Sequence, residues 1–100
     1  MSKGKSPSTS IELSTTEAIE EFKLMAKVEG RSKKTRSLYS YVFRRFLDFN
    51  EFGGKDIGKI KPKEIRRYLS FLMDEGLKNT TVAIHHRVLK AFFNWLKDEG

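Results

Sequence analysis

Residues 79–97 read NTTVAIHHRVLKAFFNWLK, and their apolar side chains would cover more than half of a helical circumference. A helix that is apolar on several sides is normally buried among other elements. We therefore expect this helix to be the central one of an all-α fold. Its apolar residues are Val82, Ile84, Val88, Leu89, Phe92, Phe93, Trp95 and Leu96.

Two amphipathic helices are predicted in the first half of the chain. Residues 14–17, Ser-Thr-Thr-Glu, form a capping box that opens a helix over 15–29, and Gly30 ends this helix. Ser32 can cap a second helix over 33–51. The short turn between the two helices predicts a helical hairpin.

A second hairpin is predicted to contain the central helix. Pro62 suits the first turn of a helix over 62–75, which Gly76 ends, and Asn79 or a neighbour can cap the helix that follows. Apolar residues recur along the helix over 62–75 at helical spacing and predict one buried face. These residues are Ile65, Tyr68, Leu69, Leu72 and Met73.

The two hairpins align with each other. Residues 18–50 fall on residues 64–96 at an offset of 46 residues (64 − 18), which pairs Gly30 with Gly76. Either the fold contains a structural repeat, or two unrelated amphipathic hairpins of equal length align in this way. Both interpretations predict a four-helix bundle made of two crossed helical hairpins.

Composition limits the kind of protein this is. The 100 residues are 38% hydrophobic, enough for one domain over 14–100 after a flexible, Ser- and Lys-rich arm over 1–13. The absence of cysteine excludes disulfides and thiolate metal sites, and two histidines cannot form a structural zinc site. We therefore expect no metal or cofactor. Since no signal peptide or membrane span is recognisable, we expect a cytoplasmic protein without a membrane partner.

Positive charge is distributed unevenly along the chain. The formal net charge is +7, yet the helix predicted over 15–29 is net acidic. Residues 31–47 carry Lys and Arg without any acidic residue, as do residues 77–97. Positive charge confined to alternate helices is typical of a surface that binds nucleic-acid phosphates. The alternative is a solvated basic face without a binding role.

Several short motifs occur in a characteristic order. They are Thr35 and Thr81 near the starts of the second and fourth predicted helices, Tyr39, Ile60-Lys-Pro62, Gly76, and Phe92-Phe93-x-Trp95-Leu96. In this order the chain resembles, over 14–100, the N-terminal core-binding (SAM-like) domain of tyrosine recombinases, a family of phage integrases and Xer-type site-specific recombinases.

The resemblance implies a division of labour within a longer parent protein. In this family the core-binding domain and a C-terminal catalytic domain clamp duplex DNA, and the catalytic domain supplies the nucleophilic tyrosine. His85-His86-Arg87 does not have the spacing of the family's His-x-x-Arg motif, and Tyr39, Tyr41 and Tyr68 have no recognisable catalytic surroundings. We therefore expect a binding domain that is not itself an enzyme. His86 is expected to be a half-buried packing residue.

The resemblance also implies the partners and the setting. Double-stranded DNA, the parent's catalytic domain and sister recombinase protomers are the expected partners. The parent would be prokaryotic, archaeal or phage-encoded, and would associate with the nucleoid when it is bound to DNA.

The side chains expected to contact DNA lie on or beside the second helix of each hairpin. The cations should meet phosphates, and the threonines should donate from their hydroxyl groups. Ser37 and Tyr41 share this face on a helical wheel. Leu38 and Ile84 could contact thymine methyl groups or pack inside the domain. The expected phosphate-binding cations are Lys33, Lys34, Arg36, Arg44, Lys78, Arg87 and Lys90, and the hydroxyl donors are Thr35, Thr80 and Thr81.

Two other kinds of protein fit parts of the pattern. One is a helical protein-interaction module that binds an acidic partner through Tyr41 and the basic face. The other is a helix-turn-helix regulator. That fold would require a polar, exposed second helix, whereas the helices predicted over 33–51 and 79–97 are both rich in apolar residues.

Overall fold

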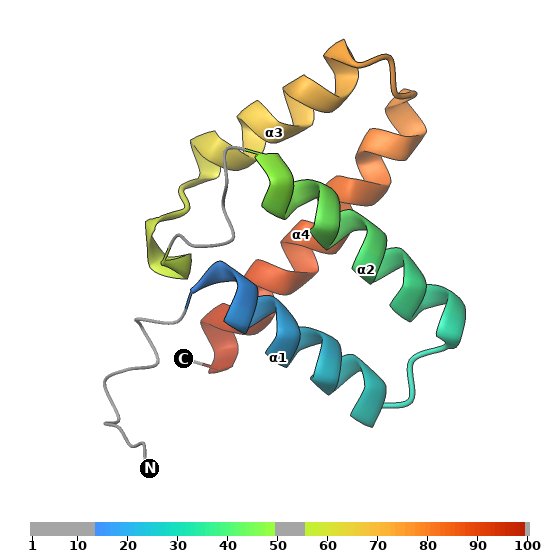
Figure 1. Cartoon of the computed structure of the whole chain (residues 1–100), viewed down its shortest axis with the longest axis vertical. Helices are drawn as coiled ribbons and strands as arrows, with labels where there is room; N and C mark the ends of the chain where they lie inside the picture. The colour runs from blue at the N-terminus through green and yellow to red at the C-terminus, as the bar shows by residue number, and fades with distance from the viewer. Residues whose placement is uncertain (1–13, 50–55, 100) are drawn as a thin grey trace.

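The computed structural model describes residues 14–49 and 56–99, and the described chain is helical (Figure 1). Its elements are α1 (Thr15–Val28), α2 (Lys33–Asp48), the short 3-10 helix η4 (Ile57–Lys59), α3 (Pro62–Asp74) and α4 (Asn79–Glu99). The predicted all-α class is confirmed. The arm over 1–13 and the predicted end of the second helix at 50–51 lie outside the described residues.

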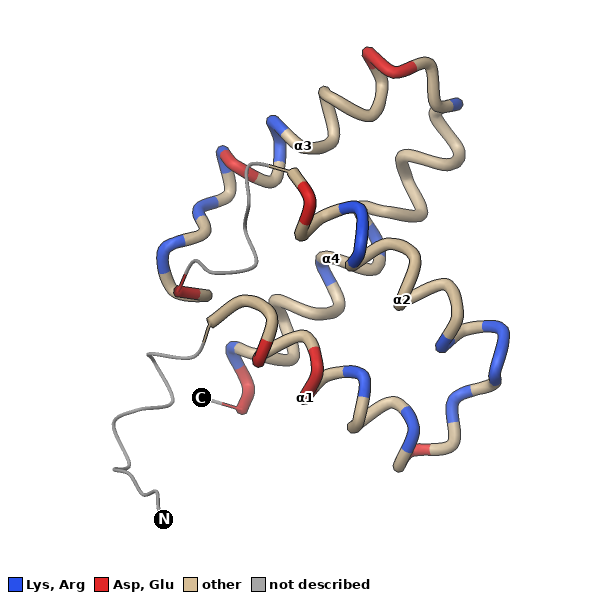
Figure 2. Tube along the Cα trace, viewed as in Figure 1, with Lys and Arg blue, Asp and Glu red and all other residues tan. Residues whose placement is uncertain are grey.

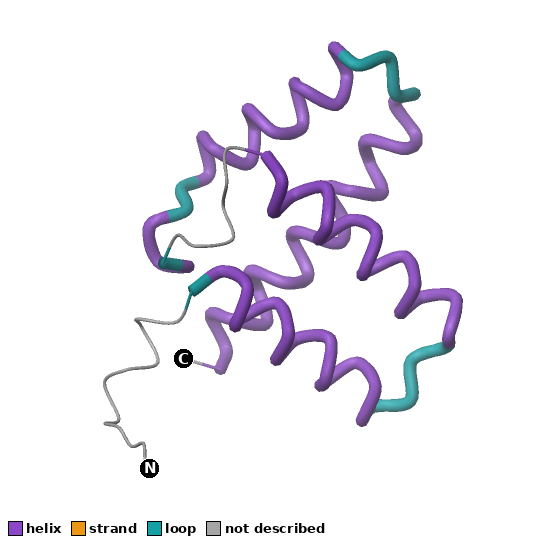
Figure 3. The backbone as a smooth tube through the Cα atoms, viewed as in Figure 1, coloured by secondary structure: helices purple, strands orange, loops and turns teal. Residues whose placement is uncertain are grey.

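The two hairpins are built in the same way. Figure 3 shows α1 joined to α2, and α3 joined to α4, by tight turns on the same side of the molecule. Gly30 and Gly76 both have a positive φ, +80° and +94°, which favours glycine.

The hydrogen bonds of the two turns also correspond. The N–H of Arg31 donates to the carbonyl of Ala26, and the N–H of Leu77 donates to the carbonyl of Leu72. Both are the bonds of a Schellman motif. Two identical turns at the same offset support the interpretation as a structural repeat.

The predicted helix starts are formed by specific side chains. The hydroxyl of Ser14 accepts from the N–H of Glu17, and the carboxylate of Glu17 accepts from the N–H of Ser14, which completes the capping box. At the start of α3, the carboxylate of Glu64 accepts from the N–H of Lys61 at 2.8 Å. Pro62 follows at the first helical position, where a missing N–H costs nothing.

Helix α4 is the centre of the fold, as its apolar pattern predicts. It contacts α1, α2 and α3. In Figure 1 it runs behind the first hairpin and crosses it. The ring of Phe92 is fully buried and lies 5.5 Å from the ring of Phe22 and 5.2 Å from that of Phe43, so one aromatic cluster joins α4 to both helices of the first hairpin.

One prediction about the core is wrong. Helical spacing predicts that Met73 lies on the buried face of α3, but Met73 is 52% exposed. Tyr68 and Leu72 are fully buried and define the side of α3 that faces the core. Met73 follows Leu72 by about 100° around the helix, which carries it past the edge of that face.

Phe92 and Met73 allow the packing to be tested with two truncations. Phe92→Ala should lower the free energy of unfolding by about 3–5 kcal/mol because it opens a cavity among packed rings. Met73→Ala should change it by no more than about 0.5 kcal/mol because the side chain is half in solvent. Chemical denaturation followed by circular dichroism measures both. Similar losses for the two variants would contradict the assigned core.

Candidate nucleic-acid interface

The start of α2 presents cations and hydroxyl groups at the N-terminal end of the helix. The Ser32 hydroxyl accepts from the N–H of Thr35 and donates to Thr35 Oγ1, both at 3.1 Å. This leaves the hydroxyl proton of Thr35 free to donate elsewhere. Lys33, Lys34 and Arg36 are exposed, and the first turn contains no acidic residue. The charge therefore adds to the positive end of the helix dipole.

The start of α4 has a similar composition. Lys78 precedes the helix and is exposed, and its carbonyl accepts from the N–H of Val82. The first turn again contains no acidic residue. Thr80 is exposed, whereas Thr81 is half-buried and has less access to a ligand. Figure 2 shows that the basic starts of α2 and α4 lie toward the same side of the molecule.

Most of the predicted contact residues are accessible. Tyr41 is 51% exposed, and Thr35, Thr81 and Ile84 are half-buried. Leu38 is 37% exposed and so reaches solvent more readily than Ile84. The exposed members of the predicted set are Lys33, Lys34, Arg36, Ser37, Tyr41, Arg44, Lys78, Thr80, Arg87 and Lys90.

These residues do not share one patch. Lys33, Arg36 and Ser37 line a groove between α1 and α2. Arg44 lines a neighbouring groove that also includes Glu20 of the acidic helix α1. Lys90 turns toward α3, where it lines a largely apolar groove. The accessible cations are therefore spread around α2 and α4.

A second basic group lies outside the residues that the sequence predicts to contact DNA. The expectation that positive charge is confined to alternate helices is wrong, because η4 and the first half of α3 are also basic (Figure 2). The run KIKPKEIRR over 59–67 contains the cations that indicate this group, and the same stretch also begins the apolar spacing that predicts a core face. The exposed cations of this α3 basic cluster are Lys59, Lys61, Lys63, Arg66 and Arg67.

The two histidines are placed differently from the prediction. His86, expected to be half-buried, is exposed, while His85 is 1% exposed. The ring of His85 turns inward, where Tyr68 lies close enough for its hydroxyl to reach His85 Nδ1 at 3.0 Å. Tyr68 therefore has a polar partner that the sequence did not reveal.

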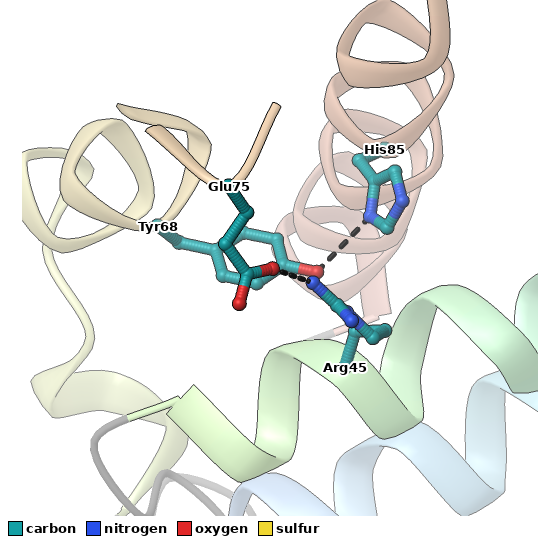
Figure 4. Close-up of polar contacts among 4 residues, drawn as sticks. All are labelled: Arg45, Tyr68, Glu75 and His85. Carbon is teal, nitrogen blue, oxygen red and sulfur yellow. Dashed lines mark hydrogen bonds and ion pairs between the residues drawn. The ribbon is translucent and has the colours of Figure 1, made fainter. Parts of the chain in front are cut away.

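Arg45 and Glu75 lie beside this pair (Figure 4). The guanidinium of Arg45 on α2 donates to the carboxylate of Glu75, which follows α3. This hydrogen bond raises the pKa of Arg45 above its already high ordinary value. Arg45 is therefore engaged within the protein and is a poor candidate for a phosphate contact.

Burial changes the acidity of both ring groups. It raises the pKa of the Tyr68 hydroxyl well above its ordinary value, although the charge of Arg45 acts in the opposite direction. Burial, assisted by the charge of Arg45, lowers the pKa of His85. At neutral pH the tyrosine is therefore protonated and the histidine is neutral.

The described residues contain no group of three or more potential metal ligands. No helix within residues 14–49 or 56–99 is long and apolar enough to span a membrane.

Comparisons with known proteins agree with this architecture. Residues 15–100 match the family described as the phage integrase N-terminal SAM-like domain. The chain is 33% identical over 79 residues to the tyrosine recombinase XerA of Thermococcus onnurineus (strain NA1), covering 79% of this chain and 26% of that protein. It is 31% identical over 86 residues to XerA of Thermococcus kodakarensis (strain ATCC BAA-918 / JCM 12380 / KOD1), covering 84% and 28%.

A bacterial relative gives the same result. The chain is 35% identical over 82 residues to the tyrosine recombinase XerC of Staphylococcus carnosus (strain TM300), covering 80% of this chain and 28% of that protein. The chain thus spans between a quarter and a third of the length of these relatives, and no solved structure matches it. On the family match, the chain belongs to the phage integrase N-terminal SAM-like domains.

Proposed function

We propose that this chain is the DNA-binding domain of a site-specific tyrosine recombinase or integrase. The observation that carries the proposal is the composition of two corresponding helix starts. α2 begins with three exposed cations, α4 follows the exposed Lys78, both starts carry hydroxyl groups, and neither first turn contains an acidic residue. Helix starts of this kind suit the phosphate groups of a duplex.

The proposed role is one half of a clamp. Because the chain spans no more than 28% of the XerA relatives, their remaining length can hold a catalytic domain. We propose that this catalytic domain closes on the opposite side of the duplex and performs strand cleavage, so the present chain binds DNA without cutting it. Sister protomers on the same DNA would complete the recombining assembly, on the nucleoid in the cytoplasm.

The α3 basic cluster extends the surface available to phosphates. Its five cations are exposed and lie away from the starts of α2 and α4. We propose that it adds nonspecific attraction to the duplex. Leu38 is a better candidate than Ile84 for an apolar contact with thymine methyl groups, because Leu38 is the more exposed.

The alternatives make different demands on the same helices. A helix-turn-helix regulator needs an exposed recognition helix, but α2 buries Val42, Phe43 and Phe46. A protein-interaction module would use the basic face for an acidic partner. Such a module would bind the acidic partner more tightly than DNA, and the binding experiment below distinguishes the two.

The dependence of duplex binding on salt tests the phosphate contacts. With about four to six phosphates neutralised, the logarithm of the association constant should fall against the logarithm of salt concentration with a slope of about −4 to −5. Fluorescence anisotropy with a labelled duplex measures this slope. An affinity that does not change with salt would contradict the proposal, as would tighter binding to an acidic peptide.

Arg87 separates binding from folding. Arg87→Ala should leave the free energy of unfolding within about 0.5 kcal/mol, since the side chain is exposed. It should weaken duplex binding and make the salt slope shallower by about one unit. Lys97→Ala is the matched control, because Lys97 is an exposed cation in the last turn of the same helix. Equal effects of the two changes on duplex binding would remove Arg87 from the contact surface.

A further inference from the structure

Arg45, Tyr68, Glu75 and His85 form a polar cluster at the junction of the two hairpins, here called the interhairpin clasp (Figure 4). Arg45 belongs to the first hairpin and the other three residues belong to the second. The bond from Arg45 to Glu75 crosses between the hairpins, and the bond between Tyr68 and His85 ties α3 to α4. Arg45 lies beside the hydroxyl of Tyr68, so the two bonded pairs lie together at the meeting point of α2, α3 and α4.

Aromatic rings support the clasp from the side of α2. The ring of Phe46 lies 5.3 Å from that of Tyr68, and the ring of Phe49 lies 5.5 Å from Tyr68 and 5.1 Å from Phe71. These contacts fix the ring of Tyr68. Its hydroxyl is thereby held where it can meet His85, and its placement depends on the position of α2.

At neutral pH the hydrogen bond between Tyr68 and His85 joins a protonated hydroxyl to a neutral imidazole. Which of the two groups donates depends on which ring nitrogen of His85 carries the proton. The other ring nitrogen of His85 is Nε2. That atom is buried and has no hydrogen-bond partner among the described residues.

Protonation of His85 would disturb this arrangement in two ways. The imidazolium donates from both nitrogens, so the Tyr68 hydroxyl would have to accept from Nδ1, and a charged N–H would stand at the buried Nε2, which has no hydrogen-bond partner among the described residues. A second positive charge would also be placed near Arg45, inside the protein. The titratable groups of the described residues that face His85 are Tyr41 and Arg45 from α2 and Tyr68 from α3. The nearby carboxylate of Glu75, which follows α3, is already bonded to Arg45.

The clasp also touches the proposed DNA-binding surface. The ring of Tyr41 lies edge-on to the ring of His85 with 5.8 Å between their centroids, while Tyr41 itself is half exposed among the predicted contact residues. Its place between the clasp and solvent provides a direct physical connection from His85 to the outer face of α2.

We propose that the clasp is a positioning device that holds the starts of α2 and α4 at the separation needed for duplex binding, and that a proton on His85 releases it. The effect on DNA binding rests on the proposed function. The effect on the separation of the hairpins is independent of it, because that effect follows from the contacts of the four residues.

The lowered pKa of His85 gives the expected pH dependence of stability. The unfolded chain takes up this proton at an ordinary pKa of about 6.5, whereas the folded chain does so only at lower pH. Between these two values the unfolded state binds more protons, so stability is complete above about pH 6.5 and declines as the pH falls toward the folded pKa.

Two glutamine variants isolate the contribution of His85 to that decline. His85→Gln should flatten the fall in stability below pH 6.5, while exposed His86→Gln should retain it. Thermal melts at a series of pH values compare the three proteins. A decline that persists unchanged in His85→Gln would assign it to other groups and contradict this role of His85.

The separation of the two hairpins can be measured directly. The chain contains no cysteine, and Leu24 on α1 and Met73 on α3 are 53% and 52% exposed. Spin labels on L24C and M73C therefore report the separation of the hairpins from positions outside the proposed DNA contacts. Double electron–electron resonance gives the distance distribution, and circular dichroism on the same samples establishes that the helices persist.

The labelled protein should give one narrow distribution at neutral pH and a shifted or broader one at about pH 5, below the ordinary pKa of histidine. Tyr68→Phe, which removes only the hydroxyl, should show the altered distribution already at neutral pH and bind duplex about fivefold more weakly or worse. Glu75→Gln should act in the same direction and serves if Tyr68→Phe does not fold. His86→Gln should match the parent.

Unchanged distances in acid and in both clasp variants would overturn the inference, as would changed distances without weaker duplex binding. Failure of the parent to bind any duplex, with distances that still respond to Tyr68→Phe, would instead overturn the proposed function on which the DNA effect rests.

Discussion

The burial of α4 is the constraint on which the rest of the structure depends. This helix contacts the other three, and its Phe92 completes an aromatic cluster with Phe22 and Phe43 of the first hairpin. Because one side of α4 is committed to this core, its remaining surface and its first turn are left for solvent and for ligands. The same division holds on α2, which buries Val42, Phe43 and Phe46 and leaves its basic first turn exposed.

Local signals accounted for most of the fold. The capping box at Ser14, the cap at Ser32 and the glycines at Gly30 and Gly76 act over a few residues, so the sequence could indicate where helices begin and end. Met73 is a residue for which helical spacing predicts the wrong environment. Helical spacing places a residue near a face, but the width of that face depends on which helices pack against it.

The candidate site was predicted less completely, because its features depend on the crossing of the hairpins. Tyr68 and His85 are 17 residues apart in sequence, and Arg45 and Glu75 are 30 apart. Nothing local distinguishes buried His85 from exposed His86, or engaged Arg45 from Arg44, until helix packing is known. The cations of the α3 basic cluster are adjacent in the sequence and could have been predicted, but the helix was interpreted from its apolar residues alone. The interhairpin clasp thus connects the packing of the two hairpins with the proposed DNA-binding surface.

The location of the duplex on the domain tests the central claim most directly. Amide chemical shifts, followed as a short duplex is added, report which backbone segments meet it. The account predicts that the largest changes fall on the first turns of α2 and α4, around Lys33 and Thr80. Changes confined to α1 and α3, with both helix starts unaffected, would contradict it.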